Sequence, residues 1–253
     1  MQDIALIVNT VDKNKDIWPL FFKQIEKHTV GNLFKSKYIF VNHTEDPLPA
    51  DYNVLYFDKE QPYQQQFASC IKDVPEKYCI YISEDYILYS DVRADLIKEY
   101  CHVLSQNPNI SFIRFMKGGV VDVEYPPYQD HNDLYEMHHS FPYFYTNQAA
   151  LWQTRDLEKI HVHGPPLHIG NLDWQNSFEF QATRTCQELD IRGLFCYHGE
   201  PKRGVYHYDC KVFPHISTAL VKGKWNISEY KEELPALLKQ YNINIEERGV
   251  VEC

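Results

Sequence analysis

The stretch YCIYISEDYILYSD, residues 78–91, runs from an apolar segment directly into two acids. Residues 78–82 are apolar enough for a strand in the middle of a sheet, covered on both faces. Ser83, Glu84 and Asp85 follow at once, so carboxylates stand at the carboxyl end of the predicted strand. Whether they perform chemistry or only begin a turn depends on what the rest of the chain builds beside them.

The first half of the chain alternates between strand-like and helix-like segments. Short apolar runs predict strands at 4–8, 37–41, 54–56, 78–82 and 111–115. Helical spacing of apolar residues predicts helices that begin near Asp16, Tyr63 and Asp91. Such alternation is typical of parallel strands joined by helical crossovers. We therefore predict an α/β fold with a mostly parallel central sheet flanked by helices.

The second half is less regular. Residues 118–147 are rich in Tyr, Pro, His and Asp, which indicates a long functional loop region. A short helix is predicted from Thr154 and a stronger one over about 173–189. A C-terminal helix begins at Ser228 or, because Pro235 interrupts it, near Glu233.

Composition excludes several classes of protein. The 253 residues are 44% hydrophobic, enough for a substantial core, and no apolar run approaches the roughly 20 residues that span a bilayer. The seven cysteines are scattered and form no C-x-x-C pair, which favours a reducing cytoplasm. A formal charge of -10 argues against binding nucleic acid. We expect a cytoplasmic protein and leave open a peripheral association with a membrane.

Polar residues follow several of the predicted strands. In an open α/β sheet, ligands bind beyond the carboxyl ends of the strands, near the point where strand order reverses. This places Asn9, Thr10, the 42–46 turn and the Glu84–Asp85 pair at one rim. Carboxylates there suit Mg²⁺ or Mn²⁺, which bind carboxylate and phosphate oxygens. Acid pairs after strands also serve simply as turn caps, and the tripeptide alone favours neither interpretation.

Four segments together resemble GT-A-fold glycosyltransferases of the small bacterial and viral type. Residues 63–88 are similar to the helix and strand that lead to their D-x-D-type metal motif, with Ser83-Glu84-Asp85 at the three motif positions. Residues 144–152 (FYTNQAALW) are similar to the strand before the acceptor-side helix. Residues 176–180 (NSFEF) are similar to a helical signature of these enzymes, and residues 215–225 (HISTALVKGKW) to their closing K-G-K-W segment. The resemblance covers most of 4–226, and it departs from the pattern at Ser83, where the first acid is missing.

The resemblance implies transfer of a sugar from a nucleotide-sugar donor, with a UDP-sugar as the first guess, to a hydroxyl of a glycan or glycolipid. Charge develops on the departing diphosphate and needs a cation or basic groups beside it. Asp85 would hold Mn²⁺ or Mg²⁺, with His215 as a further ligand and His207 as its competitor. Lys222 and Lys224 would reach the diphosphate, although lysines in a solvated surface turn are the simpler interpretation.

An inverting transfer also needs a base for the acceptor hydroxyl. Glu179 is the predicted base, because the apolar residues on either side can raise the pKa of its carboxyl. Asp173 is the reserve choice, unless it only caps the helix. A plain salt-bridge role for Glu179 is the alternative.

Nucleotide recognition is assigned to the early rim. Asn9 and Thr10 are predicted to bond to the ribose or base edges, and Asp46 or its acidic neighbour to accept a base N–H. Gln65 or the next glutamine would reach the nucleotide from its helix, and Glu84 would contribute to the donor site. All of these are ordinary turn and surface residues as well.

We treat residues 1–253 as a single catalytic domain, with a nucleotide-sugar-binding half (1–116), an acceptor-binding half (117–226) and a C-terminal helix (227–253). Two other functions stay open. A sugar nucleotidyltransferase usually carries a Gly-rich basic loop after the first strand, and residues 9–12 lack glycine. A non-catalytic carbohydrate-binding protein on the same fold would account for Ser83.

Overall fold

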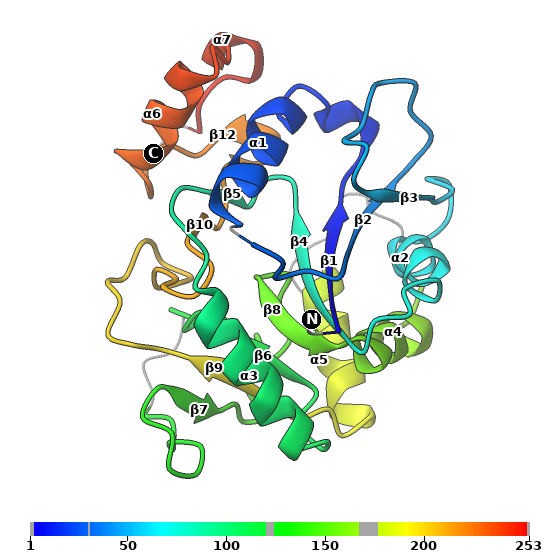
Figure 1. The fold of residues 1–253 in the computed structure, drawn as a ribbon, viewed down its shortest axis with the longest axis vertical. Helices are drawn as coiled ribbons and strands as arrows, with labels where there is room; N and C mark the ends of the chain where they lie inside the picture. The colour runs from blue at the N-terminus through cyan, green and yellow to red at the C-terminus, as the bar shows by residue number, and fades with distance from the viewer. Residues whose placement is uncertain (1–2, 30, 120–123, 167–176, 252–253) are drawn as a thin grey trace.

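The computed structural model describes residues 3–29, 31–119, 124–166 and 177–251. Its centre is an eight-stranded sheet with the strand order β3-β2-β1-β4-β8-β6-β9-β7 (Figure 1). The strands are β1 (Ile4–Asn9), β2 (Ser36–Val41), β3 (Asn53–Tyr56), β4 (Tyr78–Ser83), β6 (Phe112–Arg114), β7 (Leu134–Glu136), β8 (Ala150–Gln153) and β9 (Gly193–Cys196). Strands β1 to β4 are parallel, and β8 runs antiparallel between β4 and β6. The predicted α/β fold with a mostly parallel sheet is confirmed.

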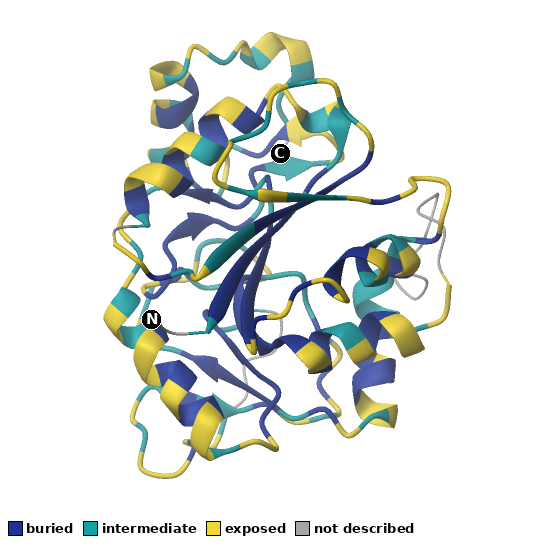
Figure 2. Ribbon diagram, turned by 45° about the vertical axis from the view of Figure 1, so that its right-hand side comes forward, coloured by how far each residue is buried: buried dark blue, intermediate teal, exposed yellow. Residues whose placement is uncertain are grey.

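Helices cover both faces of this sheet. One face packs against α1 (Trp18–His28) and α3 (Ala94–Gln106), and the other against α2 (Tyr63–Ile71), α4 (Thr154–His163) and α5 (Phe178–Glu188). Alternate residues of a strand point to opposite faces. Leu6 and Ile80 therefore lie in the first core and Ala5 and Cys79 in the second. This explains the unbroken apolar run of β4, and Figure 2 shows the central strands buried along their length.

Several helix starts differ from the prediction. Helix α5 begins at Phe178 rather than near 173, because Ser177 is extended and its Oγ accepts a hydrogen bond from the Phe180 N–H at 3.3 Å. Helix α3 begins at Ala94, since the Asp91 carboxylate pairs with a ring nitrogen of His28 at 2.7 Å instead of capping the helix.

Helix α1 likewise begins at Trp18, because Asp16 is paired elsewhere. The C-terminal helix α6 (Glu233–Gln240) begins at Glu233, so the second of the two predicted starts is confirmed and Ser228 is not its beginning.

The C-terminal part of the chain returns to α1. It comprises the short pair β5 (Ile87–Leu88) with β10 (His215–Ile216), the hairpin of β11 (Leu220–Val221) and β12 (Lys224–Trp225), then α6 and α7 (Ile245–Arg248). Ile17 and Leu20 share a buried cluster with Trp225 and Leu234. Figure 1 shows α6 and α7 beside β12 and α1 at one end of the molecule. Segments far apart in the sequence therefore share one buried cluster.

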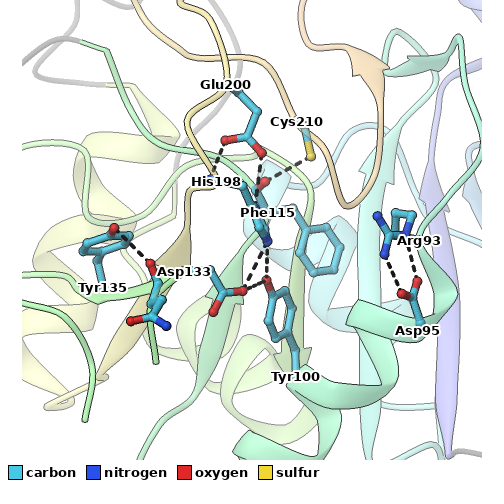
Figure 3. A network of polar contacts seen from close by, with 10 residues as sticks. Arg93, Asp95, Tyr100, Phe115, Asp133, Tyr135, His198, Glu200 and Cys210 are labelled. Carbon is cyan, nitrogen blue, oxygen red and sulfur yellow. Dashed lines mark hydrogen bonds and ion pairs between the residues drawn. The ribbon is translucent and has the colours of Figure 1, made fainter. Parts of the chain in front are cut away.

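A separate polar network joins α3 to the outer strands (Figure 3). The Tyr100 hydroxyl donates to the Asp133 carboxylate at 2.7 Å, and the two His198 ring nitrogens lie 3.2 Å from Asp133 and 3.2 Å from Glu200. Burial alone would raise the pKa of Glu200, but hydrogen bonds from the His198 ring and backbone outweigh it and hold that pKa below its ordinary value. The network fixes α3, the segment before β7 and the segment after β9 to one another.

Across the described ranges, none of the helices combines the length and the apolar character needed to cross a bilayer.

Candidate functional site

The strand order reverses at β1. The chain passes from β1 outward to β2 and β3 and then returns to the other side of β1 to form β4. The carboxyl ends of β1 and β4 meet here, with Asn9 opposite Ser83. A cavity of about 960 Å³ opens at this point and is lined by Asn9, Thr10, Glu84 and Asp85 among others. We call it the switch-point cavity. It lies where open α/β sheets bind their ligands.

Glu84 is a buried part of the cavity wall, only 6% exposed. The Asn14 side-chain amide donates to its carboxylate. Burial raises the pKa of Glu84, and hydrogen bonds from Asn14 and Thr10 oppose that shift. The Thr10 hydroxyl also accepts from the Trp18 indole N–H at 2.8 Å. Glu84 and Thr10 therefore help to hold the first loop against β4, whatever else they contact.

Asp85 differs from Glu84 in having no such support. It is half-buried, and among the described residues no other side chain donates a hydrogen bond to its carboxylate. Burial first, and the neighbouring Glu84 charge second, raise the pKa of Asp85 to about 8. A free carboxylate of this kind fits a divalent cation, because Mg²⁺ is commonly held by one or two carboxylates together with substrate phosphates.

His215 is fully buried and has a free ring nitrogen. Its Nδ1 lies 2.6 Å from the Phe213 carbonyl, and its Nε2 has no hydrogen-bond partner. Burial lowers the pKa of His215 to about 4, so the ring is neutral. Metal-binding histidines show this arrangement. Within the described ranges, however, there is no group of three or more His, Cys, Asp or Glu side chains that could hold a metal ion. Binding of a divalent cation by Asp85 and His215 therefore stays a prediction. The competitor His207 lines a different cavity, described below, together with Asp85.

Lys222 and Lys224 lie at the tip of the β11–β12 hairpin and are exposed. Lys222 (φ 51°) and Gly223 (φ 81°) form the turn, and only Gly223 of this group lines the switch-point cavity. Of the described lysines, Lys13 and Lys15 line the cavity, and neither was predicted from the sequence.

The remaining predicted nucleotide residues are more scattered. Asp46 lines a neighbouring cavity of about 720 Å³. Its carboxylate lies 3.0 Å from the ammonium group of Lys15, and Lys15 lines both this cavity and the switch-point cavity. Gln65 is exposed on α2, from which Tyr63 reaches the switch-point cavity instead. Asp173 lies outside the described residues.

A third cavity, of about 510 Å³, contains Glu179. We call it the Glu179 cavity. Asp85 and Asn147 line both it and the switch-point cavity, so the two spaces adjoin at these residues. The Glu179 carboxylate accepts a hydrogen bond from the Asn147 backbone N–H at 2.8 Å. Burial raises the pKa of Glu179, and this hydrogen bond and then the charge of Arg114 oppose the shift.

Arg114 is a site residue that the sequence analysis missed. It ends β6, is 4% exposed and lines the Glu179 cavity. Its Nη2 donates to the carbonyls of Tyr143 and Phe144 at 3.0 and 2.9 Å and contacts the Met137 sulfur at 3.3 Å. An arginine inside the apolar run SFIRF was the available signal, because a buried charge requires a reason.

The architecture of this chain is similar to those of several solved structures. No protein-family model matches the sequence, and no curated protein matches it. Among solved structures, a UDP-glucose pyrophosphorylase complexed with UDP-glucose aligns with a TM-score of 0.50 and 8% identity, covering 96% of this chain and all of the other (100%). The chain has a GT-A/nucleotidyltransferase-like fold. At this identity the likeness shows the fold alone.

Two further structures are similar at lower scores. S. aureus TarS 1-349 in complex with UDP-GlcNAc aligns with a TM-score of 0.48 and 12% identity over 98% of this chain and 69% of that one. In another structure of the same fragment the chain spans 60% of its length. A cytidylyltransferase from Leptospira borgpetersenii aligns with a TM-score of 0.45 and 10% identity. The structures similar to this GT-A-like chain therefore include a pyrophosphorylase and a cytidylyltransferase as well as TarS.

Proposed function

We propose that this protein is a glycosyltransferase that uses a nucleotide-sugar donor and a hydroxyl acceptor, such as a glycan or glycolipid. The observation that carries the proposal is the pair of cavities that adjoin at Asp85 and Asn147. Sugar transfer requires two substrates to meet at the anomeric carbon. The donor would occupy the switch-point cavity, and the acceptor the Glu179 cavity.

Glu179 is the proposed base of an inverting transfer. The acceptor O–H proton passes to the Glu179 carboxylate as the acceptor oxygen bonds to the anomeric carbon, and the bonding electrons of the broken C–O bond leave with the diphosphate. A raised pKa suits this role, because a base works best with a pKa near the working pH. The Asn147 N–H holds one carboxylate oxygen and leaves the other for the acceptor.

A divalent cation, when bound, would offset charge on the departing diphosphate, and Asp85 is the described residue best suited to hold it. Asp85 also lies between the two proposed substrates. No side chain in the described part of the structure donates a hydrogen bond to its carboxylate, which supports this role.

The test measures UDP release from a panel of UDP-sugars, with and without Mn²⁺ and with simple glycan acceptors. Glu179→Gln should lower turnover by about 100- to 10,000-fold, the usual contribution of a general base, and leave UDP affinity unchanged. Glu188→Gln is the matched control, since Glu188 is exposed at the far end of the same helix.

Other outcomes would identify another function. Pyrophosphate release from a nucleoside triphosphate and a sugar phosphate would make the protein a nucleotidyltransferase. Binding of glycans without binding of any nucleoside diphosphate would favour the non-catalytic alternative. Normal turnover by Glu179→Gln would remove Glu179 from the chemistry.

A further inference from the structure

We propose that Arg248, from the C-terminal part of the chain, binds the diphosphate of the donor, and that Asp16 holds its guanidinium in place until the donor arrives. This rests on the proposed function, because it names the cation that recognises the donor's diphosphate. It also transfers that role from the exposed Lys222 and Lys224 to a residue inside the cavity.

The position of Arg248 supports this assignment. It ends α7 and lines the switch-point cavity, more than 200 residues along the chain from the first strand. Its guanidinium donates to both Asp16 carboxylate oxygens, to the Asn14 side-chain oxygen at 3.2 Å and to the Gly223 carbonyl at 3.3 Å. Asn14 in turn donates to Glu84. Arg248 is therefore linked through Asn14 to the acidic motif after β4.

The charges around the cavity also favour Arg248. Among the residues that the structure describes, four acids line the cavity: Asp16, Glu84, Asp85 and Glu247. These acids would repel a diphosphate unless cations offset their charge. Lys15 lies largely in solvent, with 56% of its side chain exposed, and is paired with Asp46. The Arg248 side chain is only 14% exposed. A planar guanidinium can also grip phosphate oxygens with two parallel hydrogen bonds, which an ammonium cannot.

In the absence of a ligand, the Asp16 carboxylate occupies the hydrogen-bond donors of Arg248 that a phosphate would use. Its carboxylate is 40% exposed and takes two donors of the guanidinium, as a phosphate group would. A diphosphate offers more charge and more acceptor oxygens than one carboxylate. Replacement of the Asp16 carboxylate by the diphosphate of the donor is therefore favourable. Before the donor binds, Asp16 holds the Arg248 guanidinium in its orientation, which reduces the entropy cost of binding.

The experiment measures binding of UDP and uridine to the full chain by calorimetry, in EDTA and in Mn²⁺. Arg248→Gln should weaken UDP binding by about 10- to 100-fold, the range for hydrogen bonds to a charged group, and leave uridine binding unchanged. Asp16→Asn should strengthen UDP binding, because the asparagine keeps an acceptor oxygen that can orient the guanidinium while the competing negative charge is gone.

The matched control is Arg93→Gln. Arg93 forms the same two-pronged pair with Asp95, at 2.9 and 2.6 Å, at the start of α3 (Figure 3), and it lines none of the three cavities. This variant should bind UDP like the wild type.

The outcomes separate the two proposals. If wild-type protein binds UDP and Arg248→Gln binds it equally well, the inference is wrong and the proposed function stands. If Arg248→Gln weakened UDP and uridine binding equally, the Arg248–Asp16 pair would have only a structural role and the inference would be wrong. Loss of UDP binding in Asp16→Asn would lead to the same conclusion. A wild-type protein that binds no nucleoside diphosphate would refute the proposed function and the inference with it.

Discussion

Arg114→Met removes a buried cation that supports the wall of the Glu179 cavity. The carbonyls of Tyr143 and Phe144 each lose a charged donor, and such bonds are worth roughly 1.5–3 kcal/mol each. Methionine fills part of the volume and avoids the cost of burying a charge, which offsets some of this loss. We expect a net loss of about 2–4 kcal/mol, or about 5–15 °C in the midpoint of thermal unfolding for a chain of this size.

The same substitution should change the pH dependence of turnover. Burial raises the pKa of Glu179, and Arg114 partly opposes it, so losing Arg114 raises that pKa further. A base acts in its ionised form, and activity is lost as pH falls through its pKa. The acid limb of the turnover profile should therefore move to higher pH. Arg114→Lys keeps the charge and should return the limb toward its wild-type position.

Differential scanning calorimetry and a pH–rate profile provide the two readouts. Arg155→Met is the control, because Arg155 is exposed on α4 and its loss should cost less than about 0.5 kcal/mol. An unchanged acid limb in a destabilised Arg114→Met variant would show that Glu179 is not the base. An unchanged unfolding midpoint would refute the energetic argument itself.

Two further predictions concern stability. Asp85→Asn should raise the unfolding midpoint in EDTA. The pKa of Asp85 is raised from 3.8 to about 8, so its ionisation lowers the stability of the wild-type protein as pH rises between these values. The stabilisation by Asp85→Asn should therefore be absent near pH 4 and greatest at and above pH 8. Thermal scans across that range would contradict this if the variant melted lower at pH 8. Gly193→Ala should lower the free energy of unfolding by about 1–3 kcal/mol in urea titrations, because a Cβ there would lie 2.2 Å from the Phe112 ring. Gly118→Ala is the control, because a Cβ there would lie no closer than 3.8 Å to another side chain and should change the stability little. Equal effects at the two glycines would rule out the steric explanation.

Strands β1, β2 and β4 could be predicted because burial on both faces leaves a continuous apolar run. The edge strand β3 is exposed at both ends and was predicted from a shorter apolar run. Residues 78–82 have that character, and their neighbours in β1 and β2 share it. The placement of β8 between β4 and β6 could not be predicted in the same way. Its antiparallel pairing depends on contacts between residues about 70 positions apart, such as Tyr81 and Ala150, which no local pattern records.

The candidate site was predictable only where it follows a strand. Asn9 and Asp85 lie together because parallel strands end at one edge. The K-G-K-W-like segment predicts Lys222 and Lys224 beside the diphosphate, but in the β11–β12 hairpin both side chains are exposed. Arg248 carried no signal, since its partners lie at the other end of the chain.

The distance in sequence between Asp16 and Arg248, 232 residues, also sets an order of events during synthesis. A ribosome that adds about 5–20 residues per second needs roughly 10–50 seconds to make the chain between them. Throughout that interval Asp16 lacks the guanidinium that pairs with it in the folded protein. The switch-point cavity is therefore completed only when α7 joins residues 9–16. A ligand that requires the complete cavity can therefore stabilise the early sheet only after α7 has been made.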